Sequence, residues 1–270
     1  MRAIDVLDRL RALDGGWVDE DDTVDTIKAG DPATGVDAVA VGWMSYGRAL
    51  ERAAELGCNV FVTHEPTYFD HWDDPDPDDR AAFALEAAAA KRRWIDDRGM
   101  VVLRCHDLWD RYPGQGVPDS WGRRLGFAGP DDVPASDEGF FRVYDLEERS
   151  ARAVATQVAR NVASLGQEAV QLVGPGDAPV SRVVVGTGAI TPYERLVDEY
   201  DADLVVCSDD GFTYWRDGAL AIDTGVPAVV VNHATSELAG IARLADRLDD
   251  DLDVPVHYID QACAYELVEG

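Results

Sequence analysis

Short apolar runs alternate with amphipathic segments along most of the chain. The apolar runs carry Val, Leu or other apolar residues at nearly every position, which is typical of strands buried on both faces of a sheet. Such strands are predicted at residues 37–43, 59–63, 100–104, 139–146, 168–172, 181–186, 202–208, 227–232 and 254–259. Helices, with apolar residues three and four positions apart, are predicted at 3–14, 45–57, 80–97, 118–126, 149–165, 192–200, 213–221 and 236–248.

The alternation of strands and helices predicts the fold class. Buried strands joined by helices indicate an α/β protein with largely parallel sheets. The chain has 270 residues, enough for one large domain or two smaller ones. A weak boundary at 128–138 divides it into two predicted lobes, 1–128 and 129–270. Because no long linker separates the lobes, we expect them to form one integrated domain.

The acidic composition limits the partners. The formal net charge is −28, with 52 acidic and 24 basic residues. Such a charge repels nucleic-acid phosphates and anionic membranes, so neither is expected as a partner. The charge could serve a site that collects cations. For most of it we favour a solvated acidic coat of the kind that halophilic proteins use to stay soluble.

The spacing of the cysteines and the lengths of the apolar runs indicate the cellular compartment of the protein. The four cysteines lie far apart and form no CxxC pair, so a cysteine zinc site is not expected. They fit small buried hydrophobes in a reducing environment. Residues 1–16 carry charges throughout, unlike a secretory signal. No apolar run reaches the roughly 18 residues needed to span a bilayer. The sequence therefore predicts a cytoplasmic protein.

Residue types that bind metals follow three predicted strands. They are His64 and Glu65 after the strand at 59–63, His106, Asp107 and Asp110 after 100–104, and His233 and Glu237 after 227–232. Ligands of open α/β sheets collect at the carboxyl ends of the strands, so parallel sheets would let these groups face one crevice. Imidazole and carboxylate ligands suit Zn, Mn, Fe or Ni. A carboxylate such as Glu65 or Asp110 could bridge a pair of ions, so one or two divalent ions are predicted.

Each group also has a structural alternative. A histidine at a strand end is often only a hydrogen-bonded structural residue. Asp107 and Asp110 could cap the following loop, and Glu237 could complement a helix dipole. Against this, His233 and Glu237 are four residues apart at a predicted helix start, so both side chains can point the same way.

Other chemistries find less support. The segment GTGAIT at 186–191 lacks the third glycine of the GxGxxG fingerprint, and we interpret it as a tight strand–helix turn, with anion binding by its amides as the alternative. The sequence contains neither GxxxxGK[ST] nor GxSxG. His71, in an acidic loop, and His257, predicted to lie in the core, do not join the metal-binding pattern.

Three segments carry a resemblance to a known family. VFVTHEPTYFDHWD (60–73), LRCHDLWD (103–110) and VNHATSE (231–237) resemble, in order and spacing, the signatures of the Ngg1-interacting-factor-three-like proteins. Members are also called dinuclear-metal-centre hexameric proteins, and many carry the label GTP cyclohydrolase type 2. DTIKAGDPATGVDAVAVGWM (25–44) resembles the opening segment of the subfamily with a THEPT-type motif. The resemblance covers nearly the whole chain.

The resemblance implies two related α/β lobes with a metal cleft between them, and assembly into a homo-hexameric ring. By motif position it implies metal ligands at His64, Glu65, Asp110, His233 and Glu237. The family pattern usually has two adjacent histidines after the first strand, and Glu65 stands at the second of them. His106 matches a histidine that the family pattern does not make a primary ligand. Asn232 replaces the usual glycine before the last histidine.

Two functions follow as hypotheses. The favoured one is a metal-dependent hydrolase that uses metal-activated water on a small-molecule substrate, nucleotide-like by the family label. Glu65, His106 or Asp107 would transfer protons, because each lies near the supposed metal by motif position. The alternative is a non-enzymatic metal-binding scaffold or protein-interaction ring. A third interpretation is an α/β protein whose acidic strand ends bind cations only opportunistically.

Overall fold

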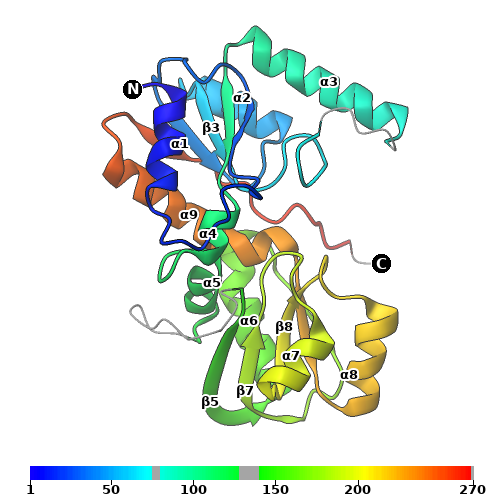
Figure 1. Cartoon of the computed structure of the whole chain (residues 1–270). Coiled ribbons are helices and arrows are strands. Elements are labelled where there is room, and N and C mark those ends of the chain that lie inside the picture. Colours follow the sequence, from blue (N-terminus) through cyan, green and yellow to red (C-terminus); the bar gives the residue numbers. More distant parts are fainter. Residues whose placement is uncertain (75–79, 128–139, 269–270) are drawn as a thin grey trace. The chain divides into compact units, whose positions relative to one another are not determined.

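The computed structural model describes residues 1–74, 80–127 and 140–268 (Figure 1). The chain consists of two compact units. Unit 1 contains Met1–Tyr112 and Ile241–Gln261, and unit 2 contains Pro113–Gly240 and Ala262–Gly270. Each unit is built on a sheet of mostly parallel strands flanked by helices, which confirms the predicted α/β class. The predicted lobe boundary at 128 lies outside the described residues.

Unit 1 contains a five-stranded sheet with the order β1-β4-β3-β2-β10. Its strands are β1 (Ile27–Ala29), β2 (Val39–Gly42), β3 (Val60–Thr63), β4 (Val101–Arg104) and β10 (Val256–Tyr258). Strands β4, β3, β2 and β10 run parallel, and β1 joins β4 antiparallel at the edge. All residues of β2, β3 and β4 are buried, including the polar end residues Thr63 and Arg104, so the apolar runs that predicted these strands lie inside the sheet.

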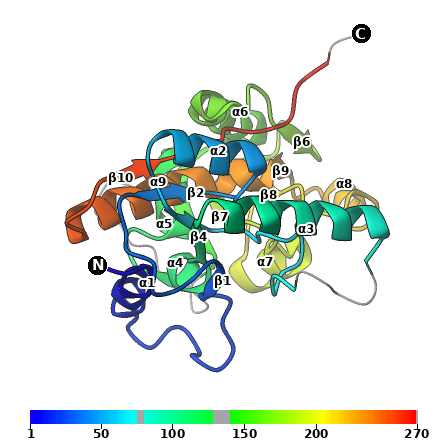
Figure 2. The same ribbon diagram turned by 90° about the horizontal axis from the view of Figure 1, so that it is seen from above.

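The helices of unit 1 cover this sheet. They are α1 (Ala3–Arg11), α2 (Gly47–Glu55), α3 (Ala82–Asp97), the short α4 (Asp107–Arg111) and the part of α9 (His233–Asp251) from Ile241 onward. Leu50 of α2 and Ile95 of α3 pack in one apolar cluster with Phe61 of β3. Figure 2 shows α1 on the opposite side of the sheet from α2. Neither β1 nor α4 was predicted from the sequence.

Unit 2 contains a second five-stranded sheet, with the order β5-β7-β8-β9-β6. Its strands are β5 (Arg142–Ser150), β6 (Gln171–Val173), β7 (Pro179–Val185), β8 (Leu204–Ser208) and β9 (Ala228–Val231). The central strands β7, β8 and β9 are parallel, and the edge strands β5 and β6 are antiparallel to their neighbours.

Helices cover both faces of the unit 2 sheet. They are α5 (Val117–Leu125), α6 (Ala151–Val162) with the 3-10 turn η1 (Ala163–Leu165), α7 (Tyr193–Tyr200), the π-helical turn η2 (Tyr214–Gly218) and α8 (Ala219–Thr224). Trp121 of α5 and Val158 of α6 pack with Val183 of β7 on one face. Leu196 of α7 and Ala221 of α8 pack with Val184 on the other. Consecutive β7 residues thus face opposite apolar layers, as expected for a strand buried on both sides.

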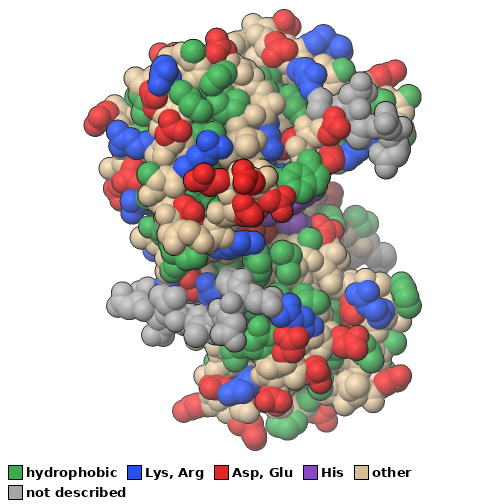
Figure 3. Space-filling model, in the orientation of Figure 1, with side chains coloured by type: hydrophobic (Ala, Val, Ile, Leu, Met, Phe, Trp, Pro, Cys, Tyr) green, Lys and Arg blue, Asp and Glu red, His purple; other side chains and the backbone are tan. Residues whose placement is uncertain are grey.

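Helix α9 (His233–Asp251) begins in unit 2 directly after β9 and ends in unit 1. Within the described part of the chain, no helix is both long and apolar enough to cross a membrane. Acidic side chains are spread over the visible surface of each unit (Figure 3).

Unit 2 also contains a buried ion pair that ties α5 to β5. Arg142 donates from Nε and Nη2 to the Oδ1 and Oδ2 atoms of Asp119, at 2.5 and 3.1 Å. Asp119 is 1% exposed and Arg142 4% exposed. Asp119 also accepts the Gly114 N–H at 2.7 Å. Because both charges are removed from water, loss of either partner would greatly lower the free energy of unfolding.

Candidate metal centre

Two neighbouring strands of unit 1 bring one group of predicted site residues together. Strands β3 and β4 are parallel, and Thr63 pairs with Arg104 at their carboxyl ends. The chain then continues from β3 into His64 and Glu65, and from β4 through His106 into α4. Helix α4 places Asp110 one turn after His106. We call the set His64, Glu65, His106, Asp107 and Asp110 the unit 1 cluster.

His64 is fully buried, and its two ring nitrogens have different surroundings. Nδ1 lies 3.1 Å from the carbonyl oxygen of Cys105, which can only accept, so Nδ1 carries the proton and donates. The lone pair is therefore on Nε2, which lies 3.4 Å from Asp110 Oδ1. A backbone carbonyl that fixes one imidazole nitrogen is the usual outer-shell partner of a metal-binding histidine.

His106 is arranged in the same way. Its Nδ1 lies 2.9 Å from Asp107 Oδ1, and its Nε2 lies 3.6 Å from Asp110 Oδ2 and 3.9 Å from Glu65 Oε1. The His106 ring stacks on the His64 ring, with 4.7 Å between centroids and 22° between planes. His64, Glu65 and His106 each place one ligand atom within 4.8 Å of the other two, close enough to share an ion.

The carboxylates dominate the electrostatics of this cluster. Burial alone would lower the pKa of His106, but Asp110 and Asp107 outweigh it and raise that pKa. Burial alone would raise the pKa of Asp107, but hydrogen bonds from His106, Thr23 and Val24 lower it. The cluster therefore favours a positive charge at its centre.

Two residues that were not predicted from the sequence, Arg104 and Asp25, hold the unit 1 cluster in place. Buried Arg104 donates from Nε to the His64 carbonyl at 2.8 Å, and its Nη2 lies 3.6 Å from Glu65 Oε2. Asp25 accepts the backbone N–H of His106 and, at 2.8 Å, that of Leu108, so it caps α4 from about eighty residues away. Burial raises the pKa of Asp25.

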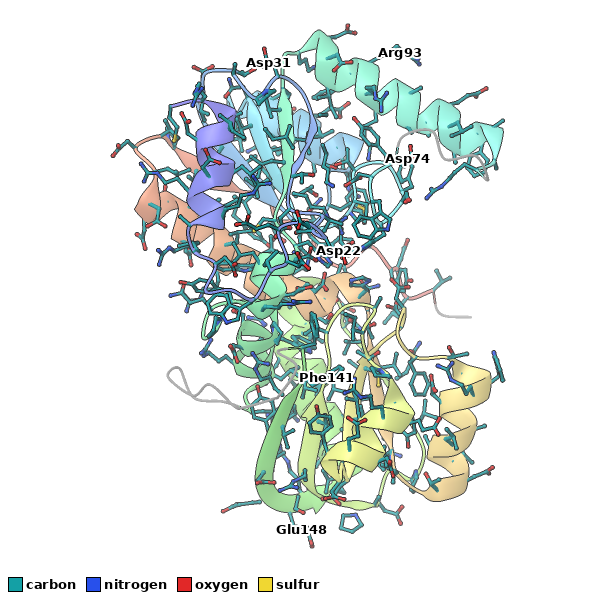
Figure 4. The ribbon with its side chains drawn as sticks, viewed as in Figure 1. Asp22, Asp31, Asp74, Arg93, Phe141 and Glu148 are labelled. Carbon is teal, nitrogen blue, oxygen red and sulfur yellow. The ribbon has the colours of Figure 1, made fainter. Side chains whose placement is uncertain are left out.

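The two histidines set aside in the sequence analysis have different positions. His71 lies beside the unit 1 cluster, where its ring meets the His106 ring edge-on with 5.8 Å between centroids. A cavity of about 280 Å³ beside it is lined by residues that include His71, Asp107 and Asp22. Figure 4 labels Asp22 of this lining. His257, on β10, is only half-buried, so its predicted core position is wrong.

Unit 2 holds the remaining predicted residues. His233 is the first residue of α9, and its Nε2 lies 3.2 Å from Oε1 of buried Glu237, one turn later. The His233 Nδ1 atom lies 2.7 Å from Asp210 Oδ2, and the backbone N–H of His233 donates to Asp209 Oδ1 at 2.8 Å. These two aspartates follow β8, and neither was predicted from the sequence as a site residue. His233, Glu237 and Asp210 form the unit 2 cluster.

The predicted strand ends thus belong to two sheets, β3 and β4 to one and β9 to the other. Within each unit, the structure brings a histidine and a carboxylate together. The convergence of the two clusters on one crevice stays a prediction.

The GTG turn after β7 packs against the unit 2 cluster. Gly188 has a φ of +56° and donates its N–H to Ser236 Oγ at 3.0 Å. A Cβ at this position would touch Glu237 Oε1 and lie 3.2 Å from His233 Nε2. Glycine is therefore required both by the backbone and by the two candidate ligands.

Replacing Gly188 with alanine is expected to weaken metal binding at least tenfold, because the new methyl group displaces Glu237. The left-handed backbone adds a loss of about 1–2 kcal/mol in the free energy of unfolding. Gly225→Ala is the matched control, since Gly225 has a φ of +78° and nothing within 4 Å of its Cβ position. Titration calorimetry with Mn²⁺ and urea unfolding separate the two effects. Equal metal affinity in both variants would contradict the assignment.

The fold and the two clusters define an α/β protein with buried histidine and carboxylate groups that could hold a divalent ion. The chain belongs to the Duf34/NIF3 (NGG1p interacting factor 3) family, whose model matches residues 18–263. This match confirms the family resemblance found in the sequence. No curated protein matches the chain at a significant level.

Several solved structures share the fold. The hypothetical protein SA1388 of Staphylococcus aureus has a TM-score of 0.78 and 15% identity, over 99% of each chain. Reduced HcgD from Methanocaldococcus jannaschii has a TM-score of 0.72 and 15% identity, over 97% of this chain and 98% of that one. TTHA1606 from Thermus thermophilus has a TM-score of 0.70 and 18% identity, over 98% and 100%. At these identities the likeness establishes the fold alone.

Proposed function

We propose that this protein is a metal-dependent hydrolase of a small polar substrate, with one or two divalent ions held by His64, Glu65, Asp110, His233 and Glu237. One observation carries the proposal. In each unit a histidine is fixed through Nδ1 by a hydrogen-bond acceptor, so that Nε2 faces a buried carboxylate.

The distances around these histidines support ligand pairs. Two atoms bound to one tetrahedral ion, with bonds of roughly 2.1 Å, lie about 3.4 Å apart. His64 Nε2 and Asp110 Oδ1 are 3.4 Å apart, and His233 Nε2 and Glu237 Oε1 are 3.2 Å apart. The Nδ1 contacts, at 3.1 and 2.7 Å, have the lengths of ordinary hydrogen bonds. The donor set of imidazole and carboxylate suits Zn, Mn, Fe or Ni.

A divalent ion in this setting would polarise the substrate and supply a nucleophilic water at neutral pH. Of the two carboxylates predicted to transfer protons, Glu65 is the better placed, because it belongs to the candidate ligand group with His64 and His106 and is 8% exposed. Asp107 is less suited, since its Oδ2 already accepts from Thr23 Oγ1 and the Val24 N–H. Arg104 orients Glu65 and holds the backbone of His64.

A cavity in unit 2 supports a small-molecule substrate. It has a volume of about 480 Å³ and borders Asp209 and Asn232, the neighbours of His233. Glu168 and Glu266 add further acidic groups, and no Lys or Arg is among the described residues that line it. This lining favours a neutral or cationic polar group over a multiply phosphorylated one. A nucleotide-like substrate stays a prediction from the family label.

A screen of the metal-loaded protein tests the function. The panel should contain nucleosides, nucleotides, phosphoesters and cyclic amides, assayed with Mn²⁺ and Zn²⁺. We expect turnover that disappears on chelation, returns with metal and is absent from His64→Ala. Tight metal binding without turnover across the panel would instead favour a non-enzymatic scaffold. Sedimentation analysis tests the predicted hexamer.

A further inference from the structure

We propose that the cavity in unit 2 binds a cationic nitrogen group of the substrate, an ammonium or a guanidinium joined to a short apolar chain. The inference rests on the proposed function, because it names the substrate class for the same protein. The residues that recognise the cation are Asn232 and Asp209, which line the cavity beside His233. Asn232 stands where the family pattern usually has glycine, so its side chain belongs to this chain rather than to that pattern.

Asn232 has an amide oxygen that is left for a ligand. The residue is 9% exposed, and its Nδ2 donates to Asp209 Oδ2 at 3.0 Å. Because a carboxylate can only accept, this contact fixes which end of the amide is the nitrogen. Among the described residues, none donates a hydrogen bond to Asn232 Oδ1. This oxygen can therefore accept an N–H from a molecule in the cavity that Asn232 borders.

Asp209 places a negative charge at the same wall. Its two oxygens accept from neutral groups, the backbone N–H of His233 at 2.8 Å and the amide of Asn232. Within the described part of the chain, no Lys or Arg forms an ion pair with it. A carboxylate has about four acceptor positions, so it can still accept from a ligand. The charge of Asp209 raises the pKa of the Tyr265 phenol, because it opposes a second negative charge in the cavity lining.

The nearest amide donor is already used within the protein. Gln167 accepts the Asn232 N–H at its Oε1, at 3.0 Å, and donates from Nε2 to the Ala169 carbonyl, also at 3.0 Å. Glu168 and Glu266 add two exposed carboxylates to the lining. The polar side chains of the lining thus offer mainly acceptors and negative charge. A head group with several N–H donors and a positive charge complements them, and a phosphate does not.

Apolar side chains in the same lining favour an organic cation over a metal ion. Val170, Val231 and Leu267 line the cavity, together with the aromatic Tyr265. An aromatic ring attracts a cation at its face, and aliphatic side chains pack against an alkyl chain. The volume of about 480 Å³ is typical of a small-molecule site. An alkyl chain of a few carbons would cover the apolar side chains while its head group contacts the acceptors.

The preference for a head group tests the inference on the metal-free wild type. Butylguanidine, 1-butanol and butyl phosphate share one alkyl chain and differ in charge. Their binding is measured by saturation-transfer NMR in about 1 M NaCl, where a screening length of about 3 Å removes most of the general attraction of an acidic surface for cations. We expect butylguanidine to bind roughly tenfold more tightly than either of the others, because charge-assisted hydrogen bonds are the stronger ones. Equal binding of 1-butanol, or no binding of butylguanidine, would overturn the inference.

Three variants locate the binding site. Asn232→Leu removes the amide at nearly the same volume, and Asp209→Asn removes the charge. Asp177→Asn is the matched control, because Asp177 is an exposed aspartate of unit 2 outside the cavity lining. We expect the affinity for butylguanidine to fall roughly tenfold in the first two variants and to stay at the wild-type value in the control. Circular dichroism verifies that each variant folds, and unchanged affinity in a folded cavity variant would overturn the role of that residue.

The result is separate from that of the substrate screen, because the probes bind the metal-free protein and are not turned over. Turnover in the screen without a preference for butylguanidine would overturn the inference and leave the proposed function standing. A preference for butylguanidine without turnover of any substrate, amines and guanidines included, would refute the hydrolase and leave the cation-binding cavity.

Discussion

Replacing His64 with alanine is expected to remove at least one metal ion per chain from the purified protein. The side chain is fully buried, with Nδ1 held by the Cys105 carbonyl and Nε2 facing Asp110. Loss of an outer-shell partner costs roughly 10- to 100-fold in metal affinity, and loss of the ligand itself should exceed that. Elemental analysis after gel filtration, together with titration of the metal-free protein, measures the change.

The control for this variant is His257→Ala. His257 is also a histidine of unit 1, but it lies on β10 opposite Ala40 and contributes to none of the contacts described for the unit 1 cluster. Its replacement should leave the metal content unchanged. A folded His64→Ala variant with wild-type metal content and affinity would contradict the assignment of His64 as a ligand.

Replacing Asp119 with alanine is expected to produce the largest loss of stability, about 3–5 kcal/mol in the free energy of unfolding. The change leaves the Arg142 guanidinium buried without the carboxylate that both Nε and Nη2 contact. It also removes the acceptor for the Gly114 N–H. Urea unfolding followed by fluorescence measures the loss.

An exposed ion pair in the same sheet provides the comparison. Asp145, also on β5, pairs with Arg182 at 2.9 Å, but its side chain is 74% exposed. Because water and salt screen such a pair, Asp145→Ala should leave the free energy of unfolding nearly unchanged. Similar losses in the two variants would show that burial of the Asp119 pair is not what makes it important.

Much of the fold could be predicted because most of its strands have a recognisable apolar pattern in their own sequence. The apolar runs at Val60–Val62 in β3 and Val101–Leu103 in β4 arise from burial on both faces of the sheet, which strongly favours apolar residues. Strand β1 has three half-buried residues and depends on antiparallel pairing with β4. Helix α4 has five residues, and its N-terminal amides are satisfied by Asp25, far away in the sequence. Neither element has a local pattern that could predict it.

In the candidate site, too, some residues could be predicted from local sequence and others could not. His64, Asp110, His233 and Glu237 could be selected because they are metal-binding residue types placed directly after predicted strands or at a helix start. The partners that orient them could not be selected. Asp210 is one of many aspartates in an acidic chain, and only the packing of β8 beside β9 brings it to His233.

Gly188 and Arg104 illustrate a further limit. The glycine could be recognised as a turn residue, but its contact with Glu237 depends on the position of α9. Arg104 ends the apolar run of β4, and the sequence alone does not indicate which group its guanidinium contacts. Its hydrogen bond to the His64 carbonyl becomes evident only when β3 and β4 are paired.

The metal content of the native protein tests the proposed metal site most directly. The protein is purified without added metal, washed with a mild chelator and analysed for all first-row divalent metals. We expect a whole number of tightly held ions per chain, with a defined affinity when the metal-free protein is titrated. Metal that washes away completely, with weak binding of no defined stoichiometry on titration, would contradict it.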